Sequence, residues 1–500
     1  VFALQSLPVA GGQLTVRGQT DAVATEATFA GSSLQLSGLV ALANALQLLD
    51  GAFDASGAVD INGSFRTAVD GTLQSKGTAV LQSASLSNEL GTLVTDSLSG
   101  KLSVEASNDA AGWQFDIAFT AEQGEAYIEP VYANFAEHAL QLLASGVRTR
   151  DFHSFVIDSF LIDQDSLLTL TGDAAVTLPG DTADNGTNSE TNSDADNDAN
   201  DVSVSGTFDI VDTSLEAIYA SVLRIMAAGT VLGDLETDGR IAGRIVVLNN
   251  EPQSAVLELQ DLILDDTKRR FALYGVNGKL VWPGPAGAPA ETSPSLLTWE
   301  SGNAYNIELG AAEINARLGG DDFELLQPMR VPTMGGALRV NKLVVNDYFS
   351  DATNGLLDAE LEPVQLGQLS GAFGWPAFSG SLAGRLPLLQ YKGNAMTVGG
   401  SLTATAFGGE IEVSGLRIGQ PFGRVPRLDA NISLRGLDLE RLTNTFSFGL
   451  IQGTLSGEVT GLSMLGWRAA AMDLHLYTPE RDRTPHRISQ RAVENLASVG

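Results

Sequence analysis

Strict alternation of apolar and polar residues is the feature that most constrains this chain of 500 residues. Every second residue is apolar in residues 428–435, LDANISLR, and again in residues 402–406, LTATA. Successive side chains of a strand point to opposite faces, so each such segment has one apolar and one polar face. One-sided alternation is typical of antiparallel sheets. The sequence therefore predicts a mainly β chain built on antiparallel strands.

One short pattern occurs three times, as VAGGQLTVRG (residues 9–18), TMGGALRVNK (residues 333–342) and AFGGEIEVSG (residues 406–415). In each copy two glycines precede alternating residues. Paired glycines supply the positive φ angles that tight hairpin turns or bulges require. We therefore expect each copy to be a turn followed by the returning strand.

A longer repeat is indicated by residues 86–102, LSNELGTLVTDSLSGKL, and residues 264–280, LDDTKRRFALYGVNGKL. Gly278 follows Gly100 by 178 positions, and Gly457 in a weaker third copy follows Gly278 by 179. Large repeats of this kind build structures in which each unit contacts mainly its neighbours.

Helical patterns are few. The best covers residues 213–226, where Thr213 and Glu216 are spaced as a capping box. Weaker patterns cover residues 39–50 and 133–145, and residues 485–499 also read as a helix. The predicted organisation is β-groove repeats (1–180), an acidic disordered linker (181–201), a helix with β-groove repeats (202–281), a Pro/Gly-rich loop (282–295), β-groove repeats (296–478) and a basic helical C-terminal segment (479–500).

Charge and cysteine content exclude several classes of function. The net charge of −31 argues against nucleic-acid binding and against broad adsorption to anionic lipid. The absence of cysteine excludes disulfides, thiolate zinc sites and iron–sulfur clusters. No cofactor is expected. The chain begins at Val1, which suggests a fragment of a longer protein.

A calcium loop is the first candidate site, because Asp194, Asp196, Asp198 and Asn200 occupy alternate positions. The glycine and the closing glutamate that such a loop needs are missing, so an acidic linker with at most weak adventitious binding is the favoured interpretation. We expect no metal site, since the four histidines also lack ligand spacing.

Catalytic motifs are equally weak. Asp151, His153 and Ser154 lie close in sequence, but on a strand Ser154 points away from the other two. Neither a G-x-S-x-G nucleophile elbow nor a phosphate-binding glycine loop occurs. Two carboxylates suffice for glycoside hydrolysis, so the sixty acidic residues leave that reaction formally open. The sequence as a whole predicts a protein that is not an enzyme.

The C-terminal segment is locally basic in an otherwise acidic chain. Its cationic side chains are Arg481, Arg483, His486, Arg487 and Arg491. Docking of an acidic partner or of a lipid head group is one interpretation. A solvated helix start is the other, and it is favoured.

Residues 437–467, LDLERLTNTFSFGLIQGTLSGEVTGLSMLGW, with the following RISQRAVENLASVG, resemble the C-terminal region of large AsmA-like proteins of Gram-negative bacteria, close to the YdbH type. Residues 262–282 are similar to strands of the same family. The acidic insert is not part of the family pattern. The resemblance implies an elongated, curved antiparallel sheet that forms a repeating β-groove, open-barrel or taco-like, with a few short helices.

For function, the resemblance implies a bridge across the periplasm that moves phospholipids between the inner and outer membranes and supports outer-membrane integrity. It also implies an inner-membrane anchor, an N-terminal helix missing from this fragment, and it allows for partner proteins in either membrane.

An apolar sheet face must be covered, and the predicted helices are too few to cover one of this size. Glycines inside strands, such as Gly384 and Gly457, permit a curled sheet. A buried acyl chain gains about 0.8 kcal/mol per methylene, so lipid is a plausible cover. The residues expected to line the groove are Leu14, Val16, Leu338, Val340, Leu402, Ile411, Val413, Leu455 and Val459. An ordinary sandwich core is the alternative for the same residues.

Two other functions stay open. A structural or adhesive extracellular β-repeat protein would have a closed core and no ligand. An outer-membrane barrel would need aromatic girdles, and an aromatic content of 7% disfavours it. The presence of a bound lipid would distinguish the lipid-transfer bridge from the structural β-repeat protein.

Overall fold

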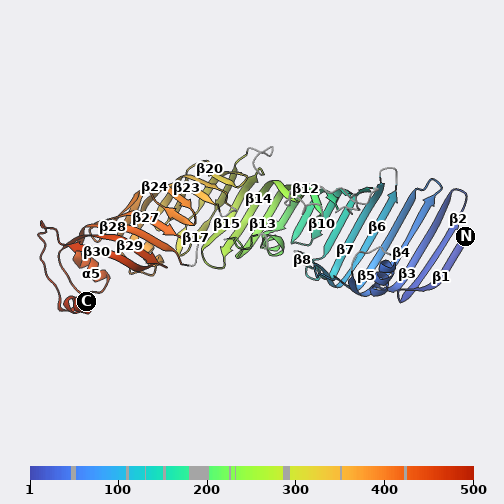
Figure 1. Cartoon of the computed structure of the whole chain (residues 1–500), viewed down its shortest axis with the longest axis horizontal. Coiled ribbons are helices and arrows are strands. Elements are labelled where there is room, and N and C mark those ends of the chain that lie inside the picture. Colours follow the sequence, from blue (N-terminus) through green and yellow to red (C-terminus); the bar gives the residue numbers. More distant parts are fainter. Residues whose placement is uncertain are drawn as a thin grey trace, which may run out of the picture. The chain divides into compact units, whose positions relative to one another are not determined.

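The computed structural model describes residues 1–46, 52–108, 112–129, 131–149, 154–178, 202–224, 227–230, 232–284, 293–348, 352–421 and 425–499. The chain forms two compact units. Unit 1 comprises Val1–Gly233 and Gly239–Leu257, and unit 2 comprises Asp234–Asp238 and Glu258–Gly500. Both are mainly β with antiparallel pairing, as the alternation predicts (Figure 1).

Unit 1 is an up-and-down meander in which each long strand pairs with the next (Figure 1). Short β8 (Val131–Asn134) pairs with the end of β7, so β9 also lies beside β7. The strands in order are β1 (Phe2–Val9), β2 (Gly12–Thr20), β3 (Ala24–Gln35), β4 (Phe53–Ala68), β5 (Leu73–Asn88), β6 (Leu93–Asn108), β7 (Gly112–Ile128), β9 (Leu140–Thr149), β10 (Ser154–Gln164), β11 (Leu168–Thr177) and β12 (Ser203–Ser214). The boundary between the units falls within β13 (Leu235–Leu248) and β14 (Glu251–Asp266).

Unit 2 is also built from antiparallel strands, and more of them are short. They are β15 (Phe271–Trp282), β16 (Ser295–Trp299), β17 (Ser301–Ala304), β18 (Ile307–Leu309), β19 (Ala312–Gly319), β20 (Asp322–Leu325), β21 (Met329–Thr333), β22 (Gly336–Asn346), β23 (Asn354–Gln365), β24 (Gly380–Lys392), β25 (Ala395–Thr397), β26 (Ser401–Ala406), β27 (Gly409–Gly419), β28 (Arg427–Asp438), β29 (Thr454–Leu465) and β30 (Arg468–Tyr477). Gly100, Gly278 and Gly457, which mark the predicted long repeat, lie in β6, β15 and β29.

The three Gly-Gly copies are hairpin turns, as expected, joining β1 to β2, β21 to β22 and β26 to β27. Only the first glycine of each pair lies in the turn, because the second begins the returning strand. Both central residues have positive φ, for example 52° at Phe407 and 77° at Gly408. This is the backbone of a type I′ turn, whose twist matches that of the paired strands.

In the described part of the chain, short helices follow four of the strands. They are α1 (Leu36–Ala45) after β3, α2 (Leu215–Ile218) with a π-helix (Tyr219–Leu223) after β12, α4 (Leu366–Ala372) after β23 and α5 (Leu439–Thr445) after β28. The residue before each helix donates its backbone N–H to a hairpin turn. The acceptors are the carbonyl oxygens of Ala10 for α1, Leu167 for α2, Met334 for α4 and Phe407 for α5. Three of these four turns are the Gly-Gly copies.

Two helix predictions need correction. Thr213 lies inside β12, one residue before its end, and the helix is capped by Ser214, whose Oγ accepts from the Ala217 N–H at 3.4 Å. The predicted capping box is wrong, because the Thr213 hydroxyl is buried and donates to backbone carbonyls instead. Residues 225 and 226 lie outside the described residues.

The helix predicted over residues 133–145 is also wrong. Those residues end β8, turn, and begin β9, where Leu140 and Leu142 pair with β7. Strand pairing on both sides outweighs the helical spacing of the leucines. The prediction for residues 39–50 is partly confirmed, since α1 starts at Leu36. The helix predicted over residues 485–499 is confirmed only from Gln490, where α6 (Gln490–Val499) begins.

Candidate functional site

The strand register of unit 1 separates its side chains into one apolar and one polar face. Ala79, Leu102 and Phe119 are direct neighbours across β5, β6 and β7, whereas Lys101 pairs with Val80 and Thr120 on the other side. The apolar row continues through every strand from β2 to β13. Its larger members are Leu14, Val16, Phe29, Ile61, Phe65, Leu81, Leu102, Phe119, Leu142, Ile162, Leu170, Phe208 and Ile245.

Over most of its area, this apolar face has no second layer formed by the described residues. All described strands belong to one sheet, so no separate second sheet lies against this face. Leu102, Ile117 and Ile162 are accordingly only half-buried although they point to the apolar side. Aromatic rings stabilise the row in places, as where Phe160 and Phe208 lie 5.7 Å apart.

Described residues cover the edge of unit 1 that carries the helices. There Leu36 of α1 and Phe135, just after β8, pack on a buried cluster with Leu98 and Ala121. This is a closed local core. It covers one end of β5, β6 and β7 and leaves the rest of the face accessible.

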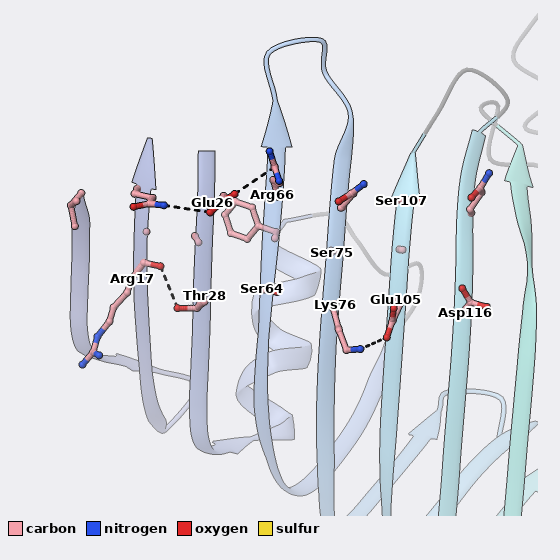
Figure 2. A pocket seen from close by; sticks show the side chains of 18 residues that line it. Arg17, Glu26, Thr28, Ser64, Arg66, Ser75, Lys76, Glu105, Ser107 and Asp116 are labelled. Carbon is pink, nitrogen blue, oxygen red and sulfur yellow. Dashed lines mark hydrogen bonds and ion pairs between the residues drawn. The ribbon is translucent and has the colours of Figure 1, made fainter. Parts of the chain in front are cut away.

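The polar face of unit 1 contains a hollow of about 740 Å³ (Figure 2). Oppositely charged side chains lie side by side along it: Lys76 pairs with Glu105, and Arg66 lies 3.5 Å from Glu26. About half or more of each side chain is exposed, so these are solvated surface pairs. Because the charges cancel, the hollow has no strong preference for an ion of either sign.

Unit 2 has the same division into faces. On β21–β23, Val340 lies between Met329 and Ala359, and Leu338 lies between Val331 and Leu361. Further along, Leu402, Val413, Ile432 and Val459 form a cross-strand row over β26–β29. The seven residues of unit 2 predicted to line a groove all lie on this apolar side.

The predicted residues differ in what covers them. Leu14 and Val16 pair with Leu7 and Leu4 of β1 and are half-buried. Ile411 and Leu455, in contrast, pack in a closed core under α4 and α5. Val340, only 3% exposed, is buried as well.

The sheet of unit 2 also bends back on itself. The turn between β17 and β18 reaches the loop after β27, where the Tyr305 hydroxyl donates to the Pro421 carbonyl at 2.7 Å. The neighbouring Asn306 Nδ2 donates to the Ala372 carbonyl at the end of α4. Next to these contacts is a hollow of about 700 Å³ lined by aromatic residues, among them Phe373 and Trp467. Sequence analysis missed it, although two of the five tryptophans lie in the turns that form it.

Two carboxylates have strongly lowered pKa values, and both have structural partners. Hydrogen bonds and charge from Arg270 lower the pKa of Asp266 to about 2, against the opposing effect of burial. Asp482 accepts from the Thr484 backbone and hydroxyl, from the Thr454 N–H and from His486 Nε2, and these bonds hold its pKa well below the usual range. Neither group faces a hollow described above.

The basic C-terminal segment returns to α5. Asn495 of α6 donates to the Phe448 carbonyl, and Ala492 is buried against this region. The arginines at positions 481, 483, 487 and 491 are exposed. Their docking role stays a prediction.

The chemical candidates from the sequence gain no support. Asp151 and His153 lie outside the described residues, as do the calcium-loop candidates Asp194, Asp196, Asp198 and Asn200. Within the described part of the chain, no group of three or more His, Asp or Glu residues is placed to hold a metal ion. No described helix has both the length and the apolar character needed to cross a membrane.

No family model, no curated protein and no solved structure matches the chain. Its function must therefore be argued from its own residues. The apolar face of unit 1, whose large side chains keep part of their surface accessible, is the feature that a function has to explain.

Proposed function

We propose that the chain is a lipid-transfer protein of the cell envelope, which carries phospholipid acyl chains along its apolar sheet faces between inner and outer membrane. The observation that carries the proposal is the apolar face of unit 1, which is continuous from β2 to β13 and whose large side chains, such as Leu102 and Ile162, are only partly buried. Large uncovered apolar surfaces on a water-exposed protein call for a partner.

An acyl chain fits this face better than a compact ligand does. Each methylene moved from water to the face gains about 0.8 kcal/mol, so a whole chain is held firmly. The face is made of many similar side chains such as Leu102, Ile162 and Leu170, with no single deep pocket. Movement along it exchanges one contact for a similar one, which permits sliding.

The polar face supports the same use. Its balanced ion pairs keep the other side of the single layer solvated (Figure 2). The net charge of −31 opposes adsorption to anionic head groups, so lipid contact is limited to the apolar side.

A structural β-repeat protein without ligand is the second candidate. The observation in its favour is that Ile411, Leu455, Leu98 and Ala121 already lie in closed local cores beneath helices and loops. If similar covers acted along each face, no lipid would be required.

The deciding experiment counts lipids on the purified chain. The protein is produced in a bacterial periplasm without detergent and extracted with organic solvent, and phospholipid per chain is measured by mass spectrometry. We expect several phospholipids per chain. A monodisperse, β-rich and lipid-free protein would contradict the proposal and favour the structural β-repeat.

A matched pair of variants on β6 tests whether the lipid lies on the apolar face. Leu102→Gln with Val104→Gln places two amides on that face, and we expect less than half of the lipid to remain. Lys101→Gln with Ser103→Gln changes the opposite face of the same strand and should leave the lipid count unchanged. Circular dichroism checks that both variants keep the sheet.

A further inference from the structure

The aromatic hollow of unit 2 has the composition of a binding site. Its volume of about 700 Å³ lies in the range typical of small-molecule pockets. It is formed where three distant segments meet: the β17–β18 turn, the end of α4 and the β29–β30 turn. Its lining includes Tyr305, Phe373, Trp375, Trp467 and Arg468.

Aromatic rings connect the hollow to the apolar side of the sheet. Phe373 lies 4.7 Å from Trp467 and 5.3 Å from Trp375, measured between ring centroids. Trp375 is followed by Phe378, which contacts Phe407 at 5.6 Å. Phe378 and Phe407 belong to the core under α4 and α5. A hydrocarbon chain in the hollow would therefore contact apolar rings along its length.

The hollow also contains polar donors. Arg468 is exposed and forms no ion pair with any described residue. The indole N–H groups of Trp282 and Trp299 donate to backbone carbonyls, whereas no hydrogen bond to a described acceptor is seen for those of Trp375 and Trp467. Arg468 and both tryptophans line the same hollow, and a guanidinium together with indole N–H donors suits a phosphate, which accepts several charge-assisted hydrogen bonds.

We infer that this hollow binds the phosphate head group of a phospholipid at Arg468, with the adjoining acyl chain on the rings of Phe373, Trp375 and Trp467. The inference rests on the proposed function, and it assigns one fixed head-group site beside a face on which acyl chains slide. Tryptophan and tyrosine are suited to such a boundary, because each has an apolar body and a polar tip.

The test measures binding of dihexanoyl phosphatidylglycerol, below its micelle concentration, to the whole chain by titration calorimetry. We expect Arg468→Gln to weaken binding about tenfold, the loss typical of one charge-assisted contact. Arg417→Gln, which removes an exposed arginine from the polar side of β27, should bind as the unchanged protein does. Equal affinity of the two variants would overturn the inference.

Two further ligands separate lipid from free phosphate and from detergent-like binding. Inorganic phosphate alone should bind far more weakly, because it lacks contacts with the rings. Octyl glucoside should bind equally to Arg468→Gln and to the unchanged protein, because it carries no charge. Phosphate binding as tight as that of the phospholipid would overturn the lipid assignment.

Trp467→Phe keeps an aromatic ring and removes the indole N–H, so it tests the hollow without emptying it. We expect a measurable loss of phospholipid affinity and none for octyl glucoside. The count of co-purified phospholipid tests the apolar faces independently. Lipid on those faces with no Arg468-dependent binding would overturn only the head-group site, whereas a lipid-free protein would overturn the proposed function.

Discussion

The backbone N–H of Asp438 donates a 2.8 Å hydrogen bond to the carbonyl oxygen of Phe407. Asp438 is the N-cap of α5, and Phe407 is the first central residue of the β26–β27 turn. Gln365 and Met334 make the same contact at α4, also at 2.8 Å. The repeated Gly-Gly pattern is thus more than a turn. Its carbonyl oxygen also positions the helix that covers the neighbouring edge of the sheet.

Gly409→Ala tests whether this turn is needed to position the helix. A Cβ at position 409 would lie 2.5 Å from the Arg435 carbonyl oxygen and 2.6 Å from the Gly436 carbonyl carbon, so rigid backbone must move. We expect unit 2 to lose about 1–3 kcal/mol of unfolding free energy, as in other overpacked sites. Urea denaturation followed by tryptophan fluorescence measures the loss.

Gly371→Ala is the control, since a Cβ there meets nothing within 4 Å. Gly371 lies inside α4, where alanine is favoured over glycine by about 0.5–1 kcal/mol. The control should therefore be neutral or stabilising. Equal destabilisation by both substitutions would contradict the role of the turn in positioning the helix.

Asp438→Ala removes the helix cap of α5. Asp438 Oδ1 accepts from the N–H groups of Glu440 and Arg441 at 2.9 and 3.3 Å. Loss of such a cap costs about 1 kcal/mol, whereas Asp438→Asn keeps an acceptor and should cost much less. If asparagine were as harmful as alanine in urea denaturation, the cap would not be the cause.

Much of the fold follows from the sequence because most of the long strands pair with the next long strand along the chain. Local alternation then decides both strand position and face, as at Val413, which lies between Leu402 and Ile432. The positions of the hairpin turns are also determined locally, because the positive φ angles at Phe407 and Gly408 depend on the residues of the turn itself.

Features that depend on distant contacts were not predictable. Helices α4 and α5 have seven residues each, too few for a clear period, and Gln365 gives α4 no side-chain cap. The hollow unites Tyr305, Phe373 and Trp467, which no local pattern relates. Ile411 and Leu455 were correctly placed on the apolar side, but their covers come from those same short helices.

The ion pairs of the polar face should contribute little to stability. Lys76 and Glu105 are each more than half exposed, so water and salt screen their attraction. We expect Lys76→Ala to change the unfolding free energy by less than about 1 kcal/mol and to leave the number of bound lipids unchanged. A clear loss of lipid in this variant would indicate that the lipid binds in the hollow of the polar face shown in Figure 2.

Acid sensitivity should come in part from Asp266, whose side chain is fully buried beside Arg270. Its pKa is lowered from 3.8 to about 2, so the unfolded chain binds this proton more readily than the folded one. The stabilisation is therefore complete above about pH 4 and is lost as the pH falls toward 2. Asp266→Asn should cost about 2–4 kcal/mol at pH 6, and the difference from the unchanged protein should shrink between pH 4 and 2.

Urea denaturation at pH 6, 4, 3 and 2.5 measures this difference. Asp234→Asn is the matched control, because it breaks the partly exposed pair with Lys268 in the same unit. Surface pairs of that kind are worth about 0–1 kcal/mol, so the control should follow the unchanged protein at every pH. A pH-independent difference for Asp266→Asn would show that the carboxylate stabilises the turn through shape and not through charge.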